Sequence, residues 1–385
     1  MKSIEHDGNL FMFHGSNFLK QRLVLSILSG KSVHIVDIRS ENDEPGLHGY
    51  EVSLIRLFDK ISNGSEININ KSGTAVMFKP GILHGGVIHH DCNLERGIGY
   101  YLDVLLALGP FCKHPINATL RGITNSKDCP SVDHIKCAAL PNLIKFLVVD
   151  DGLELKIKQR GLPPLGGGEI IFKCPVRKTL RSLQFCKPGM VKRIRGVAYT
   201  SKVSPALGNR AIEAAKGKLL QFIPDIYIYA DQNKGKNAGN SPGFGISLVA
   251  ETTDGVFYGA EHISSDVSKG EEVLTPEDLG ALVANKLLEE IYRGGCVDST
   301  FQWLTVLYMA LGQKNISKFI TGPLSNYTIH FLQHLCEFFA ITFKLDNPKP
   351  GDYGGVDEDD TLPGANKVLL TCIGVGYSNM NKRTI

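Results

Sequence analysis

The residues of this chain best suited to chemistry are arginines and lysines that stand where short elements are expected to end. Nine of them form the candidate set for binding RNA or another anion: Lys20, Arg22, Arg39, Arg96, Arg121, Arg160, Lys192, Arg193 and Arg195. Guanidinium and ammonium groups hold phosphate oxygens through charge-assisted hydrogen bonds. If repeated units bring these residues to one face, that face would hold phosphates. Ordinary solvated charge is the alternative, and the pattern leaves both open.

The densest basic run is Lys192-Arg193-Ile194-Arg195, in a strand predicted over 193–203. Because side chains alternate along a strand, Arg193 and Arg195 share one face. That face would line a groove for RNA or an acidic partner. A solvated strand face explains the run equally well.

Signals for catalysis are weak in this sequence. His330 lies early on an amphipathic helix predicted over 327–341, where a lone histidine is usually structural. The three glycines at 166–168 lack the Gly-Lys-Ser/Thr of a phosphate-binding loop, and no helix follows, so they predict a tight hairpin turn. No catalytic triad, carboxylate pair or metal-ligand spacing stands out, and we predict no metal site.

The composition is typical of a globular protein. The chain has 385 residues, a net charge of +3 and 43% hydrophobic residues, which favours two domains and permits nucleic-acid binding without requiring it. Its nine cysteines are scattered with no CxxC pair, which favours free thiols in a reducing compartment. The first ten residues are polar and charged, unlike a signal peptide, and no apolar run reaches about 18 residues. We therefore expect an intracellular, soluble protein without membrane contact.

The elements that would position the basic residues repeat three times. Each copy runs from a helix through a Gly-containing turn to an alternating strand, over 17–39, 94–122 and 297–322. A second helix and further strands follow each copy. The predicted fold class is α/β (α+β), with three units that are each a small β-sheet with two helices on one face. We expect the sheets to face inward and the helices outward.

The spacing of the copies predicts an insertion. Copy two follows copy one after about 77 residues, whereas copy three follows copy two after about 200. The surplus has its own strands and helices, and its last helix begins at Thr275. We predict a core of repeats one and two over 1–184, an inserted smaller α/β domain over 185–285, and repeat three of the core over 286–385.

Several long stretches resemble the RNA 3'-terminal phosphate cyclase superfamily, most closely its eukaryotic ribosome-biogenesis branch of cyclase-like proteins. The stretches that carry this resemblance are 18–26, 96–102, 163–169, 192–196, 222–229 and 290–300. The resemblance implies three repeated units with an inserted small α/β domain, in agreement with the spacing of the copies.

Departures from the cyclase pattern concern the expected active site. Cyclases of this superfamily activate an RNA 3'-phosphate with ATP through a covalent histidine–nucleotide intermediate, and by resemblance His330 stands at the position of that histidine. Around it, Lys20 and Asn42 replace arginines, Tyr50 replaces a glutamine, and Trp303 replaces the aspartate that assists the histidine. Such changes remove phosphate clamping and imidazole orientation. We therefore expect a non-cyclase that uses no cofactor.

The resemblance also implies a cellular role. That role is an assembly factor for the 40S ribosomal subunit, in the nucleus and nucleolus, needed for early pre-rRNA cleavages toward 18S rRNA in the small-subunit processome. The implied partners are a ribosome-biogenesis GTPase and, directly or indirectly, pre-rRNA and a small nucleolar RNP. The alternative is an RNA-processing enzyme, either a pre-rRNA endonuclease or a residual cyclase. The resemblance also attaches a nuclease role to a cluster of basic and acidic residues on the second helix of the third unit. The residues at those positions here are Gln333, His334 and Cys336, and none of them is strongly charged. This difference argues against RNA cleavage by this chain.

Overall fold

The computed structural model describes residues 6–7, 10–147, 151–264, 274–353 and 362–379. Within these ranges the strands form one five-stranded sheet, three four-stranded sheets and a small pair of β4 (Ser62–Asn63) with β7 (Ile82–Leu83). Each larger sheet belongs to one part of the sequence, so the mixed α/β fold class is confirmed.

The first unit carries the sheet of order β1-β2-β3-β6-β5. Its elements are β1 (His6–Asp7), β2 (Leu10–His14), α1 (Leu19–Ser29), β3 (Ser32–Val36), α2 (Gly49–Ile61), β5 (Glu66–Ile69) and β6 (Val76–Lys79). Helix α1 ends at Gly30, whose φ of 73° suits a residue without a side chain. Helix α2 begins with a capping box, in which the backbone N–H of His48 donates to the Glu51 carboxylate at 2.9 Å.

The second and third units repeat the mixed sheet and paired helices. Unit two has sheet order β10-β11-β9-β8 and the elements β8 (Gly85–Asp91), α3 (Ile98–Leu108), β9 (His114–Gly122), α4 (Val132–His134), the π-helix η2 (Ile135–Ala139), α5 (Leu140–Leu147), β10 (Glu154–Gln159) and β11 (Gly168–Cys174). Unit three has sheet order β12-β17-β19-β18 and the elements β12 (Gln184–Phe185), α8 (Gln302–Leu311), β17 (Ile316–Thr321), α9 (Asn326–Phe339), β18 (Lys344–Asp346), α10 (Pro350–Tyr353) and β19 (Val368–Ile373).

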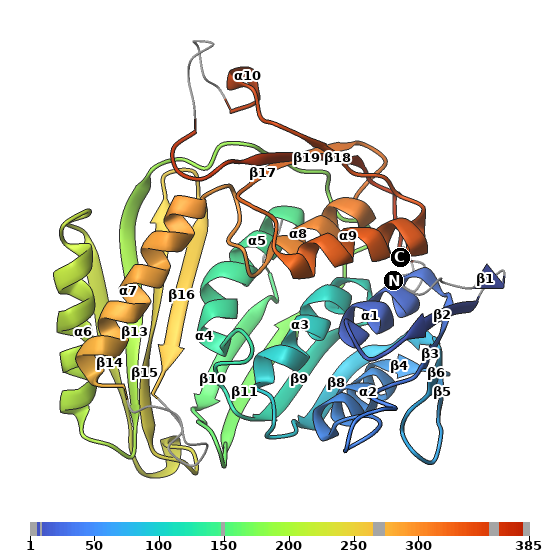
Figure 1. Cartoon of the computed structure of the whole chain (residues 1–385), viewed down its shortest axis with the longest axis horizontal. Helices are drawn as coiled ribbons and strands as arrows, with labels where there is room; N and C mark the ends of the chain where they lie inside the picture. Colours follow the sequence, from blue (N-terminus) through green and yellow to red (C-terminus); the bar gives the residue numbers. More distant parts are fainter. Residues whose placement is uncertain (1–5, 8–9, 148–150, 265–273, 354–361, 380–385) are drawn as a thin grey trace.

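The expectation of inward sheets and outward helices is wrong. Figure 1 shows α1, α3 and α8 gathered at the middle of the molecule, with the three sheets around them. Every residue of α8 is buried, and so is nearly all of α3. The physical reason lies in the sequence, because both helices are apolar on all sides and a helix of that kind is stable only in a core. The sheets instead keep one alternating face toward solvent, as in the pattern of β9.

The segment between units two and three folds as a fourth sheet with its own hydrophobic cluster. Its order is β14-β13-β15-β16, and the elements are β13 (Val191–Ser201), α6 (Pro205–Leu219), β14 (Ile226–Asn233), β15 (Gly243–Thr252), β16 (Phe257–Ile263) and α7 (Pro276–Arg293). We call this part the insert. The cluster also takes in Ile320 and Leu369 of unit three. The boundary at residue 285 remains a prediction, and it falls inside α7.

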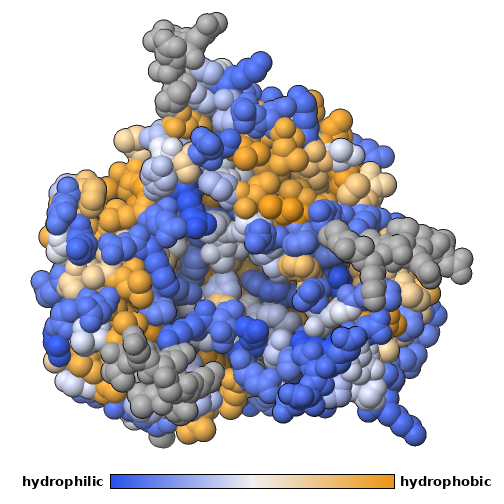
Figure 2. Space-filling model, in the orientation of Figure 1, coloured by the Kyte–Doolittle hydropathy of each residue, from blue (hydrophilic) through white to orange (hydrophobic). Residues whose placement is uncertain are grey.

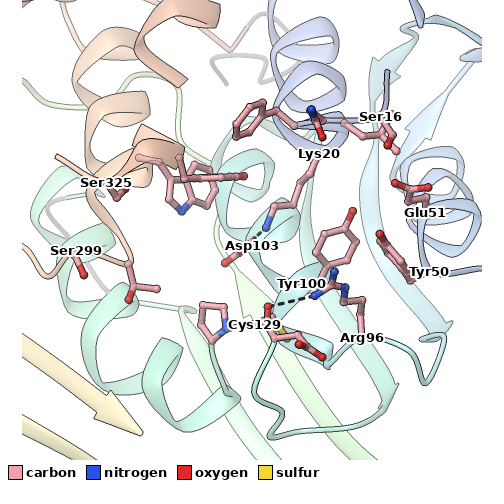
Figure 3. A pocket seen from close by; sticks show the side chains of 18 of the residues that line it. Ser16, Lys20, Tyr50, Glu51, Arg96, Tyr100, Asp103, Cys129, Ser299 and Ser325 are labelled. Atoms are coloured by element: carbon pink, nitrogen blue, oxygen red, sulfur yellow. Dashed lines mark hydrogen bonds and ion pairs between the residues drawn. The ribbon is translucent and has the colours of Figure 1, made fainter. Parts of the chain in front are cut away.

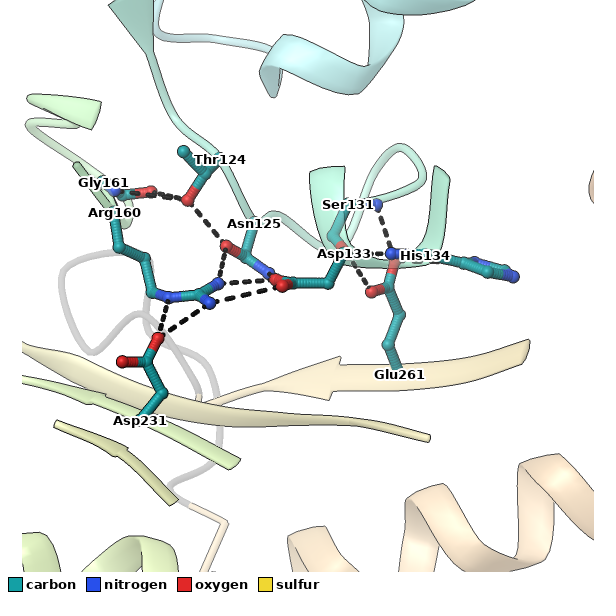
Figure 4. Close-up of polar contacts among 9 residues, drawn as sticks. All are labelled: Thr124, Asn125, Ser131, Asp133, His134, Arg160, Gly161, Asp231 and Glu261. Atoms are coloured by element: carbon teal, nitrogen blue, oxygen red, sulfur yellow. Dashed lines mark hydrogen bonds and ion pairs between the residues drawn. The ribbon is translucent and has the colours of Figure 1, made fainter. Parts of the chain in front are cut away.

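Two charge networks join the insert to the core, and Figure 4 shows the first of them, around Arg160. Arg160, just after β10, bonds Asp133 of α4 at 2.5 Å and Asp231 of β14 at 3.0 Å. Its guanidinium also lies over the ring of Tyr199 in β13, 4.4 Å from the centroid. The buried guanidinium thus has two carboxylate partners and a ring over it, so the sequence-predicted anion site at Arg160 is occupied by the protein's own carboxylates.

The second network surrounds His134, which is buried beside β16. His134 Nε2 lies 2.7 Å from Asp298, and Nδ1 lies 3.8 Å from Glu261 of β16. Burial alone would lower the pKa of His134, but the two carboxylates raise it to about 9. Gly259 leaves room for the ring, since a Cβ there would lie 2.1 Å from Nε2. The insert is thus held to the core by a buried imidazolium as well as by Arg160.

Candidate functional site

A cavity of about 570 Å³ opens where helices from all three units begin. Residues from the first turns of α1, α2, α3, α8 and α9 line it, so the N-terminal ends of five helices lie around one space. Figure 2 shows hydrophilic residues around a hollow near the centre of this face. Helix N-termini favour negative charge, which makes this cavity the place where the fold could hold an anion.

A buried ion pair occupies the middle of the cavity. Lys20, in the first turn of α1, reaches across to Asp103 of α3, and its Nζ donates to Oδ2 (Figure 3). Burial would lower the pKa of Lys20, but the Asp103 carboxylate raises it above its usual value; burial in turn raises the pKa of Asp103 against the pull of Lys20. Because the two groups are in direct contact, we take the pair as ionised.

Aromatic rings enclose this ion pair. The Lys20 ammonium lies 4.9 Å from the ring centre of Tyr100, 5.7 Å from that of Trp303 and 5.8 Å from that of Tyr327. Distances of this size allow cation–π attraction, which is strongest where water is excluded. The second oxygen of Asp103, Oδ1, is buried and has no hydrogen-bond partner among the described residues. That oxygen is an acceptor available to a donor group that enters the cavity.

Two arginines stand at the side of the cavity nearest α2. Arg39 makes a two-pronged bond to Glu51, at 2.8 and 2.7 Å, and also donates to the Gly46 carbonyl. Its φ of 46° is in the left-handed region, a conformation fixed by these three bonds. Arg96 lies over the ring of Tyr50, 4.9 Å from the centroid. Of the predicted basic residues, Lys20, Arg39 and Arg96 are those that the fold brings to this cavity.

His330 does not line the cavity. It lies on α9, one turn beyond Tyr327, and its ring packs at 4.4 Å against Phe18, the residue before α1. Phe18 itself has a φ of 59°, so the backbone is held in an unusual conformation at the point where this ring meets the histidine. The imidazole is therefore placed behind the cavity wall.

The remaining predicted residues lie apart from this cavity. Arg22 is buried, donates to the Gly15 carbonyl at 2.8 Å and lies 4.4 Å from the Phe13 ring centre. Arg121 is exposed on β9 and pairs with Glu169 of the neighbouring strand at 2.9 Å. Neither therefore joins Lys20, Arg39 and Arg96 at the cavity.

The basic run of the insert lies on β13. Lys192 and Arg193 both pair with Glu251 of β15 at 2.7 Å, and Arg195 pairs with Asp225 at 2.8 Å. All three side chains remain partly exposed, between 39% and 43%. The structure thus separates a cavity group in the core from a strand group in the insert.

A second cavity, of about 440 Å³, lies between the core and the insert and shares five lining residues with the first. It has charged residues of both signs along it, including Lys286 and Glu289 of α7.

Sequence reasoning missed Asp103, although a carboxylate inside an otherwise apolar helix was a visible signal. It also missed Tyr100 and Tyr327, for which no local signal exists.

Some classes of site find no support in the described parts of the chain. No group of three His, Cys, Asp or Glu side chains is arranged to hold a metal ion there, and all nine cysteines are free. None of the helices seen there has the length and apolar character needed to cross a bilayer.

Comparisons of the sequence with protein families and with curated proteins agree on one family. The family described as RNA 3'-terminal phosphate cyclase matches residues 11–345. A probable RNA 3'-terminal phosphate cyclase-like protein of Drosophila melanogaster is 63% identical, with 100% of both chains covered. The human RNA 3'-terminal phosphate cyclase-like protein is 55% identical over 96% of this chain and 97% of its own. The rRNA processing protein rcl1 of Schizosaccharomyces pombe is 40% identical over 98% of this chain and 99% of its own.

Proposed function

The chain belongs to the RNA 3'-terminal phosphate cyclase family, and on that premise we propose that it is a non-cyclase factor of pre-rRNA processing. It acts in assembly of the 40S subunit, within the small-subunit processome of the nucleolus, and supports the early cleavages toward 18S rRNA. A relative that covers almost the whole chain is named an rRNA processing protein, which supports this direction.

The observation that carries the proposal is the ion pair in the middle of the cavity. A nucleotide phosphate bound there would meet an ammonium group already bonded to Asp103 and enclosed by three aromatic rings. It would also lie beside a buried carboxylate, whose charge repels phosphate. His330, the candidate nucleophile, packs on Phe18 and has no place in the cavity lining. Covalent catalysis needs a nucleophile within hydrogen-bond reach of its activating groups, and this arrangement does not supply one.

The endonuclease alternative finds less support. Of the three residues at the proposed nuclease cluster, His334 is buried, and its Nδ1 lies 2.9 Å from the Gln21 side-chain oxygen. Burial lowers the pKa of His334 to about 3, so its ring is neutral at physiological pH. Gln333 and Cys336 are exposed and carry no charge. A pair of general acid and base is therefore missing from this cluster among the described residues.

The proposed partners are pre-rRNA, directly or through a small nucleolar RNP, and the ribosome-biogenesis GTPase. Arg96 is the cavity cation that faces a neutral ring, which leaves its charge for a phosphate or an acidic segment. Lys20 and Arg39 already have carboxylate partners, so a ligand would have to displace those contacts.

Labelling with ATP tests the absence of cyclase chemistry. The full chain, incubated with radiolabelled ATP and a 3'-phosphorylated RNA, should stay unlabelled and leave the RNA end open, beside an active cyclase of the family as positive control. A labelled protein band that disappears in His330→Ala would refute the non-cyclase assignment. In cells depleted of the protein, 18S precursors should accumulate, and both wild type and His330→Ala should restore 18S maturation.

A further inference from the structure

The two faces of the insert's sheet differ in what covers them. Helices α6 and α7 pack side by side on one face, as Figure 1 shows. On the other face the core covers the side of β16, where Gly259 and Glu261 meet His134. The core also reaches Tyr199 and Asp231 at the far ends of β13 and β14, but the first halves of these two strands are exposed on this side, and β14 is the edge strand. We call this open side the β13–β14 face.

Two exposed tyrosines stand on the β13–β14 face. Tyr227 is 65% exposed and Tyr229 is 51% exposed, while Ile228 between them is buried against the helices. Because alternate residues of a strand point the same way, both rings face away from α6 and α7, about 7 Å apart along β14. The solvated face of a sheet is usually polar, so two neighbouring exposed aromatic rings form a candidate surface for a ligand.

Basic side chains lie next to these rings. Parallel pairing of β13 with β14 sets Tyr227 opposite Arg195 and Tyr229 opposite Val197, and Arg193 stands two residues before Arg195 on the same face. Arg195 bonds Asp225 at 2.8 and 3.0 Å, and Arg193 bonds Glu251 at 2.7 Å. These pairs are partly exposed, so a competing phosphate can take over either guanidinium at little cost.

We propose that the β13–β14 face binds single-stranded RNA, with bases stacked on Tyr227 and Tyr229 and phosphates on Arg193 and Arg195. Stacking platforms flanked by cations are how proteins hold single strands without reading their sequence. The rings supply π-faces, and the spacing of two residues along the strand gives each ring room for one base. The choice of RNA as ligand rests on the proposed function, whereas the platform itself rests on exposure and register.

Binding of a labelled oligouridine of about 12 nucleotides to the full chain tests this platform. The Tyr227→Ala/Tyr229→Ala variant should bind at least about tenfold more weakly. Tyr227→Phe/Tyr229→Phe should bind like wild type, because stacking needs the ring and not the hydroxyl. Tyr292→Ala is the matched control, since Tyr292 is 62% exposed but lies on α7. Arg193→Glu/Arg195→Glu should weaken binding and make it less dependent on salt. The tyrosine variants should keep the wild-type unfolding temperature.

Three results would overturn the platform. They are no oligouridine binding by wild type, equal binding by the double Ala variant, or an equal loss in Tyr292→Ala. If the double Ala variant bound RNA normally yet failed to restore 18S maturation in depleted cells, the face would hold a protein and the RNA platform would be wrong. That result would not refute the proposed function. The proposed function is refuted only if ATP labels the protein or if the wild-type protein does not restore 18S maturation.

Discussion

The cavity of the core and the junction with the insert each bury a cation, but they satisfy it differently. At the junction, Arg160 bonds Asp133, Asp231 and Asn125 and lies over a tyrosine ring. In the cavity, Lys20 bonds Asp103, whose second oxygen has no partner among the described residues. An ion pair whose polar atoms are all bonded serves the fold, whereas an ion pair beside a cavity with one unbonded carboxylate oxygen leaves an acceptor for a ligand.

The largest expected effect is at the junction. Arg160→Leu leaves Asp133 and Asp231 without their shared cation, and breaking a buried ion pair from one side costs about 3–5 kcal/mol. Denaturant unfolding of the full chain measures this loss. A loss below about 1 kcal/mol would mean that the two carboxylates are solvated and that the contrast with the cavity is wrong.

The pH dependence of stability tests whether His134, the second buried cation at the junction, is charged in the folded protein. Its folded pKa of about 9 lies above the value of about 6.5 expected in the unfolded chain. A raised pKa adds stability that is complete below about pH 6.5 and lost as pH rises through 9, here roughly 3 kcal/mol. The free energy of unfolding, measured from pH 6 to 9.5, should fall more steeply for wild type than for His134→Gln. Equal slopes would show that the ring is neutral in the folded protein.

A smaller effect is expected in the cavity. Lys20→Met leaves the buried Asp103 carboxylate without its cation, but it strands one carboxylate where Arg160→Leu strands two, so the loss should be smaller, about 1–3 kcal/mol. Adding Asp103→Asn should recover part of the loss, because the remaining charge is removed. Denaturant unfolding of the two variants provides the measurement. A loss as large as that of Arg160→Leu would contradict the idea that the two sites differ.

The smallest effect is expected on the surface. Arg121 is exposed and pairs with Glu169 across two strands, so Arg121→Ala should leave the unfolding temperature unchanged within error. Calorimetry of Arg121→Ala beside wild type and Arg160→Leu, in one buffer, makes the comparison direct. A clear drop in the unfolding temperature would mean that this surface pair belongs to a larger charge network that stabilises the sheet.

Local patterns in the sequence predicted the elements well. The amphipathic helix expected over 327–341 is observed as α9, which spans Asn326–Phe339. The third copy was expected to be helical from residue 297, but α8 begins at Gln302 because Asp298 accepts the Phe301 N–H in a turn. Apolar spacing does not separate a turn of this kind from the first turn of a helix.

Long-range pairing limited the prediction of the site. Arg160 was expected to bind RNA or another anion, but it is buried and bonded to Asp133 and Asp231, which lie 27 and 71 residues away in the chain. Nothing near Arg160 in the sequence signals either partner. The expectation of outward helices failed for a reason that was visible, since α3 and α8 have no polar side, and weighing that fact would have placed them inside.

The central position of α8 has a consequence for how the protein is made. The hydroxyl of Tyr308 in α8 donates to the backbone oxygen of Leu106 in α3 at 2.9 Å, across 202 residues of chain. A ribosome that adds about 5–20 residues per second therefore completes α3 roughly 10–40 s before it completes α8, which packs against α3. During that interval a helix that is apolar on every side is in the cell without its partner. Chaperone binding to nascent units one and two should accordingly end when α8 emerges from the exit tunnel.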